Sequence, residues 1–215
     1  MSQTRGLIGA GVRAMIRRSV RKRFHSVYWH QVGEIQQAPT VFYANHHGWM
    51  DGYLMFHLVE HLGIDCVDWI EEFDTFPLFA WAGGMRYPAN DLIARAKTVK
   101  ATIDLMRKGE KSLILFAEGV LHRPPEIWPL GRSMELLAKR VPGVQFVPVS
   151  IRYELSMHER PEAWLSVGAP HKFDSLEACR LRLVESLGRT SDPFKILVSG
   201  THDVNERMSL KRFRK

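Results

Sequence analysis

Residues 39–51 read PTVFYANHHGWMD, a short apolar run followed at once by two histidines, a glycine and an aspartate. The run at residues 39–44 is rich in β-branched and aromatic residues, as in a buried strand. Residues 49–62 then have the apolar spacing of a helix. A buried strand leading into a helix is typical of an α/β fold, in which polar side chains after the strand lie where open sheets place their active sites.

The same alternation of strand and helix patterns continues along the chain. Further strands are predicted at residues 64–70, 112–117, 145–151 and 164–167, and further helices at residues 91–107, 133–140 and 176–187. We therefore expect a single α/β domain at residues 27–205, with a mixed, mainly parallel sheet flanked by helices. A basic N-terminal helical segment at residues 1–26 and a basic tail at residues 206–215 complete the chain.

The N-terminal segment predicts a basic amphipathic helix at residues 5–24. At about 100° per residue, its apolar and basic side chains separate onto two sides. The apolar side holds Leu7, Ile8, Val12, Met15 and Ile16, and the basic side holds Arg13, Arg17, Arg18 and Arg21. Such a helix can lie on an anionic membrane. It can equally pack on the domain with its basic side in water.

The charge of the 215-residue chain is strongly positive, with 30 Lys and Arg against 23 Asp and Glu. A hydrophobic fraction of 45% is ordinary for a globular domain and excludes disordered, collagen-like and disulfide-scaffold proteins. No apolar run is long enough to predict a membrane-spanning helix. Because the basic residues gather at the two ends and no nucleic-acid motif is present, we expect an anionic membrane surface, not nucleic acid, as a partner.

The two cysteines, Cys66 and Cys179, have neither metal-site nor disulfide-framework spacing. We interpret them as free thiols in a reducing compartment. Together with the basic N-terminal segment, they favour a cytoplasmic protein associated peripherally with a membrane.

His46 and Asp51 can form a catalytic pair only if the chain doubles back between them. Within one helix, Asp51 would lie about 140° around the axis from His46. If His46 precedes the helix and Asp51 lies in its first turn, the carboxylate can accept a hydrogen bond from one ring nitrogen, leaving the other to take a proton. We expect Gly48 to permit this turn. The alternatives are a capping histidine beside a surface aspartate, or a metal site that includes His47.

The pattern of Asn45, His46 and Asp51 resembles the first motif of the glycerolipid and lysophospholipid acyltransferases. Further similarities follow in order between residues 39 and 170. Residues 116–119 (FAEG) resemble the family's Phe-Pro-Glu-Gly motif, and Gly131 resembles the glycine that usually follows it. Residues 147–149 (VPV) and 167–170 (VGAP) resemble the late proline motif and the terminal strand and turn.

The resemblance implies direct acyl transfer, with His46 as general base on an acceptor hydroxyl and Asp51 as the group that orients it. The alkoxide would attack the thioester of an acyl-CoA or an acyl-carrier protein without an acyl-enzyme, and the chain contains no GxSxG. Neither a metal nor a cofactor is implied. The implied substrate-binding residues are Asn45, Gly48, Arg86, Glu118, Gly119 and Arg123. Of these, Asn45 and Gly48 would hold the loop or the thioester oxygen, and Glu118 would contact the acceptor hydroxyl.

Two phosphate-binding arginines of this family are missing from their usual positions. Asn90 stands where the second motif has an arginine, and it could instead cap the following helix. Arg86 and Arg123 are the nearest substitutes. Because phosphate is normally held by charge-assisted, often bidentate contacts, we expect an acceptor whose phosphate is held differently or a neutral glycolipid or aminolipid. The alternative is a non-catalytic or hydrolytic lipid- or thioester-binding protein on the same scaffold.

Overall fold

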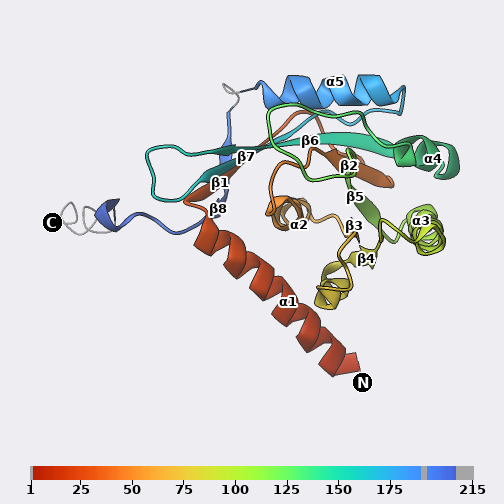
Figure 1. The fold of residues 1–215 in the computed structure, drawn as a ribbon, viewed down its shortest axis with the longest axis horizontal. Coiled ribbons are helices and arrows are strands. Elements are labelled where there is room, and N and C mark those ends of the chain that lie inside the picture. The colour runs from red at the N-terminus through yellow and green to blue at the C-terminus, as the bar shows by residue number, and fades with distance from the viewer. Residues whose placement is uncertain (1, 190–192, 207–215) are drawn as a thin grey trace.

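A computed structural model describes residues 2–189 and 193–206 as one α/β domain built on an eight-stranded sheet (Figure 1). The strand order is β4-β3-β5-β2-β6-β7-β1-β8. The strands are β1 (Ser26–Gln31), β2 (Thr40–Ala44), β3 (Cys66–Ile70), β4 (Gly84–Arg86), β5 (Ser112–Phe116), β6 (Gln145–Glu154), β7 (Glu162–Val167) and β8 (Lys195–Ser199). The helices are α1 (Ser2–Arg23), α2 (Asp51–His61), the short 3-10 helix η1 (Pro77–Ala82), α3 (Leu92–Arg107), α4 (Ser133–Arg140) and α5 (Leu176–Leu187).

The sheet is mixed and mainly parallel, as the sequence predicts. Its centre is β2, which runs parallel to β5 on one side and to β6 on the other. All five residues of β2 are buried, because helices cover both faces of the sheet. The antiparallel pairs, β6 with β7 and β1 with β8, lie on the β6 side of β2.

Two apolar cores lie on opposite faces of the sheet. Phe42 and Ala44 of β2 pack toward α1 and α2, whereas Val41 and Tyr43 pack toward α3, α4 and α5. Figure 1 shows α5 on one side of the sheet and α2 on the other. This alternation along a single strand places the end of β2 between the two layers, where residues 45–48 leave the sheet.

The predicted helices at residues 133–140 and 176–187 have the same bounds as α4 and α5. The prediction missed β1, β4, β8 and η1. Both β4 and β8 are edge strands of the sheet, and β8 is mostly exposed. An edge strand forms because a neighbouring strand offers it hydrogen-bond partners. Its own sequence therefore need not alternate between apolar and polar residues.

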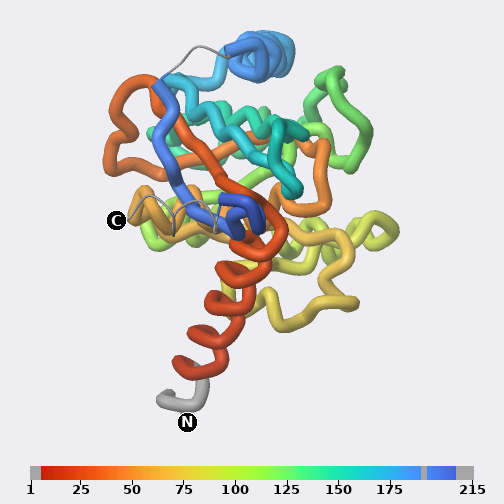
Figure 2. The backbone as a smooth tube through the Cα atoms, turned by 90° about the vertical axis from the view of Figure 1, so that its left-hand side faces the viewer, coloured from red at the N-terminus to blue at the C-terminus, as the bar shows by residue number. Residues whose placement is uncertain are grey.

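Helix α1 packs on the domain through a face that differs from the predicted apolar side. Its buried side chains are Val12, Ile16 and Val20, and the helix contacts α2 and η1. The prediction that Leu7, Ile8 and Met15 share this face is wrong, since all three are exposed. Figure 2 shows α1 running away from the body toward its N-terminus. None of the helices in residues 2–189 and 193–206 has the length and apolarity needed to cross a membrane.

Candidate active site

His46 and Asp51 meet across the tight turn that joins β2 to α2. His46 lies in the turn, and Asp51 is the first residue of α2. The His46 Nδ1 and Asp51 Oδ2 atoms are 2.9 Å apart. The Asp51 side chain is fully buried, whereas 24% of the His46 side chain is exposed. The predicted doubling back of the chain is therefore confirmed. Among the described residues the His46 Nε2 atom has no hydrogen-bond partner, so it can accept a proton.

The Asp51 carboxylate accepts three hydrogen bonds. Besides the one from His46, Oδ2 accepts one from the Gly48 backbone N–H at 2.9 Å, and Oδ1 accepts one from the Tyr153 hydroxyl. Burial, with the Asp51 charge beside it, raises the pKa of Tyr153, so this hydroxyl stays protonated as a donor. Sequence reasoning missed Tyr153. It lies on β6, 102 residues from Asp51, and no local pattern marks it.

Gly48 is needed here for space. A Cβ atom at this position would lie 2.5 Å from the Tyr153 ring, and Gly48 is not among the described glycines with positive φ. Gly48 lies in the turn as expected, and it is the missing side chain, not a positive φ, that the turn requires. Its lack of a side chain lets the tyrosine reach the aspartate.

Asn45 and Glu118 hold the loop that carries His46. The Asn45 amide donates to the Ile151 carbonyl at 2.9 Å and accepts from the Ile151 N–H at 2.7 Å, which fixes the loop to β6. The buried Glu118 carboxylate accepts from the backbone N–H groups of His46 and Trp128 and pairs with His122 Nε2 at 2.6 Å. Both side chains thus act on the position of His46. Contact of Glu118 with an acceptor hydroxyl stays a prediction.

A cleft of about 1420 Å³ opens beside His46. This volume exceeds the roughly 300–1,000 Å³ of a typical small-molecule pocket. The His46 ring stacks on Phe116 with ring centroids 4.3 Å apart, and both residues line the cleft. Gly119, at φ +75°, also lines it. The remaining walls come mostly from α1, α2, β3, η1, β4, α3 and β5, and they are mainly apolar.

The two candidate arginines do not line this cleft. Arg86 is bound by Asp74, with Nη2 2.9 Å from Oδ2, and lies 3.6 Å from Asp91. Arg123 is exposed on the loop after Glu118. Asn90 is exposed as well, and Asp91 caps α3 instead, because its side chain accepts from the Ala94 N–H at 2.8 Å. The interpretation of Asn90 as the helix cap is therefore wrong.

The cysteine that lines the cleft is not suited to act as a thiol nucleophile. Cys66 is buried on β3, and this burial raises the pKa of its thiol. The protonated thiol is a poor nucleophile.

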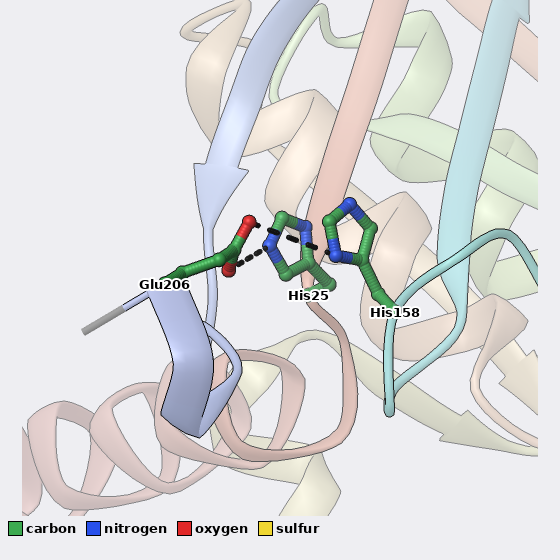
Figure 3. A group of neighbouring side chains, drawn as sticks. All are labelled: His25, His158 and Glu206. Atoms are coloured by element: carbon green, nitrogen blue, oxygen red, sulfur yellow. Dashed lines mark hydrogen bonds and ion pairs between the residues drawn. The ribbon is translucent and has the colours of Figure 1, made fainter. Parts of the chain in front are cut away.

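Three groups of side chains in the described part of the chain could reach a metal ion: His25 with His158 and Glu206, His47 with Glu118 and His122, and His171 with Asp174 and Cys179. In the first group, the two imidazole rings stack with centroids 3.5 Å apart and planes 4° from parallel (Figure 3). A metal about 2.1 Å from both nitrogens would lie well outside both ring planes. The geometry instead suits a structural contact between distant parts of the chain, in which Glu206 Oε2 lies 3.0 Å from His25 Nε2.

A family model described as Acyltransferase matches residues 26–152, which include the turn from β2 to α2 and the segment around Glu118. The match ends one residue before Tyr153. No curated protein matches the chain.

Proposed function

The chain belongs to the acyltransferase family, and we propose that it moves a fatty acyl group from the thioester of CoA or of an acyl-carrier protein to a hydroxyl of a lipid-like acceptor. The hydrogen bond between His46 Nδ1 and Asp51 supports this proposal most directly. It leaves Nε2 as the proton acceptor on a residue that lines a large, mainly apolar cleft.

In this mechanism, His46 Nε2 removes the proton of the acceptor hydroxyl as the oxygen attacks the thioester carbonyl. Asp51 stabilises the imidazolium that forms. When the tetrahedral intermediate collapses, the C–S bond breaks and the imidazolium returns its proton to the leaving thiolate. The products are an oxygen ester and a free thiol, and His46 is neutral again for the next turnover.

We propose an acceptor without a terminal phosphate. Asp74 already binds Arg86, and both Arg86 and Arg123 lie outside the cleft-lining set. Neither arginine would give a phosphate dianion in the cleft the bidentate guanidinium contacts that usually hold it, and the arginines that do line the cleft, Arg13, Arg23 and Arg95, come from α1 and α3. A neutral glycolipid or an aminolipid fits this arrangement better.

An assay of purified protein with an acyl thioester tests the function. We expect thiol release to depend on added acceptor and the product to be an acylated acceptor, with neutral acceptors used faster than lysophosphatidate. Thiol release with only free fatty acid as product would support the hydrolytic alternative. Lack of thiol release with every acceptor would support a binding protein.

The Tyr153→Phe variant should lower kcat about tenfold, because it removes one hydrogen bond to a charged group, worth roughly 1.5–3 kcal/mol, from the Asp51 carboxylate. Steady-state kinetics of single and double variants measure this effect. Tyr28→Phe is the matched control, since the Tyr28 hydroxyl donates to Glu162 at 3.2 Å, outside the site. If Tyr153 acts through Asp51, its effect should disappear in an Asp51→Asn background. Equal losses in both backgrounds would contradict this positioning role.

We further propose that α1 brings the protein to an anionic membrane surface. Leu7, Ile8 and Met15 are exposed on α1, at 73%, 40% and 42%. Arg18 and Arg21 of the same helix are exposed as well. Apolar side chains flanked by basic ones suit the interface of an anionic bilayer.

Replacing Leu7, Ile8 and Met15 by serine should weaken binding to anionic vesicles by tenfold or more, on the order of 1.5 kcal/mol for partial burial of three apolar side chains. Cosedimentation measures this binding. The control is Leu155→Ser with Met157→Ser, which removes two exposed apolar side chains from the β6–β7 hairpin. Equal pelleting of the serine triple variant and the wild type would contradict the role of α1. Deletion of α1 is a poorer test, because Val12, Ile16 and Val20 belong to the core.

A further inference from the structure

Asp68 is a carboxylic acid in the wall of the apolar cleft. It lies in the middle of β3 and is one of the cleft-lining residues. Its neighbours in the sheet are Gly84 on β4 and Ile114 on β5, and neither has a polar side chain. The carboxyl group thus has no polar side chain on its two sheet partners, and its one named donor is the backbone N–H of Trp69.

One oxygen of this carboxyl group is left without a partner. Asp68 Oδ1 is buried and makes no hydrogen bond within the described residues. The other oxygen, Oδ2, lies beneath the first turn of α2, since a Cβ atom added to Gly52 would be 3.7 Å from it. Gly52 directly follows Asp51, so the carboxyl group and the catalytic pair lie against the same helix turn. An unsatisfied buried acceptor costs free energy that a donor on a ligand could recover.

We infer that Asp68 is a specificity-determining residue that accepts a hydrogen bond from a hydroxyl or N–H group of the substrate. This inference rests on the proposed function and narrows its substrate class. The preferred substrate would have a hydrogen-bond donor along the part that enters the cleft. A phosphate or carboxylate at this position would offer no donor and would repel the carboxylate form of Asp68.

The donor should be separated from the reacting atoms by a spacer. Asp68 pairs with Ile114, which in turn pairs with Phe42, two residues before the end of β2. Two residues along a strand and two strands across the sheet place Asp68 on the order of 10 Å from the start of the catalytic turn. The donor can belong to the acyl chain or to the acceptor.

A matrix of substrates separates these two sources. The acyl donors are two thioesters of equal chain length, one saturated and one with a mid-chain hydroxyl. The acceptors are a long-chain alcohol and an alkyl glycoside of similar length. We expect the wild type to favour the hydroxylated member of one pair by tenfold or more in kcat/KM. The arm in which this preference appears identifies the source.

Two substitutions at Asp68 test its part in this preference. Asp68→Leu removes the acceptor and should bring the kcat/KM ratio of the hydroxylated over the plain substrate to about one. Asp68→Asn keeps a carbonyl acceptor and should retain part of the preference for a hydroxyl. Asp104→Asn, an exposed carboxylate on α3, is the matched control and should behave as the wild type. An unchanged preference in Asp68→Leu, or no preference in the wild type, would overturn the inference.

A binding measurement keeps this test separate from the proposed function. Calorimetry with non-reactive thioether analogues of the two acyl donors and with the two acceptors reports recognition without turnover. If the wild type transfers no acyl group, the proposed function fails, but a tenfold binding preference lost in Asp68→Leu would still support the contact. If transfer occurs without any role for Asp68, only this inference fails.

Thermal unfolding at several pH values checks that the variants fold. Burial raises the pKa of the Asp68 carboxyl to about 7, so its protonated form favours the folded state. This contribution is complete below the unfolded pKa of about 3.9 and is lost as the pH rises to about 7. An amide does not ionise, so the Asp68→Asn variant does not lose stability in this way as the pH rises. Its Tm should therefore exceed that of the wild type at pH 8, and the difference should shrink toward pH 4.

Discussion

The His46→Ala variant is expected to lose acyl transfer by at least about 10²–10⁴-fold while the protein stays folded. The His46 ring stacks on Phe116 and is partly exposed, so its removal takes away little core packing. It does take away the proton acceptor, since the only described partner of its ring nitrogens is Asp51. Thiol release and product formation should fall together in the presence of acceptor.

His61→Ala is the control for this variant. His61 lies at the far end of the same helix, is exposed, and packs edge-on against Trp29 with ring centroids 4.7 Å apart. Its activity should equal that of the wild type. All three proteins should give the same circular dichroism spectrum and unfold cooperatively. Near wild-type turnover in His46→Ala would remove the general-base assignment.

The Asp51→Asn variant should lose about 10³–10⁴-fold in kcat, nearly as much as His46→Ala. An amide has one oxygen acceptor, whereas the Asp51 carboxylate accepts from Gly48, Tyr153 and His46. The amide N–H₂ would point at one of these donors. His46 would then lose either its orientation or its tautomer, and the imidazolium would lose its counter-charge.

The Asp51→Asn variant should also be less stable than the wild type, because one of the three donors to the buried Asp51 carboxylate loses its acceptor. Loss of such a partner costs about 1–3 kcal/mol in the free energy of unfolding, which urea denaturation at pH 7 can measure. Asp203→Asn is a comparison outside the site, since Asp203 pairs with His158 at 3.0 Å near the C-terminal end of the described chain. It should leave kcat unchanged. An Asp51→Asn protein with wild-type kcat would show that His46 needs no carboxylate partner.

Local patterns predicted the central elements of the fold and the contact between His46 and Asp51. The buried run before Asn45 gave β2, and the spacing of His46 and Asp51 gave a contact within one turn. Short-range geometry determines both features. The same reasoning predicted α4 and α5 with their observed bounds, since their apolar spacing comes from a single packed face.

Contacts between distant parts of the chain were not predictable in this way. Tyr153 reaches Asp51 across 102 residues, and only the pairing of β6 with β2 brings it there. Asp68 is one polar residue in a short apolar strand, and its sequence does not tell whether it faces water or a cleft. For α1, helical periodicity grouped Leu7, Ile8 and Met15 with Val12 and Ile16, but only Val12 and Ile16 of this group pack into the core.

Helix α1 touches two environments at once. Its Arg13, Ile16 and Arg23 line the substrate cleft, while Leu7 and Met15 face away from the core. One helix thus contributes both to the wall of the cleft and to the outer face. If docking on a bilayer shifts α1 and changes affinity for a lipid by some factor, the bound lipid changes affinity for the bilayer by the same factor. A filled and an empty cleft would then give the protein different residence times on the membrane.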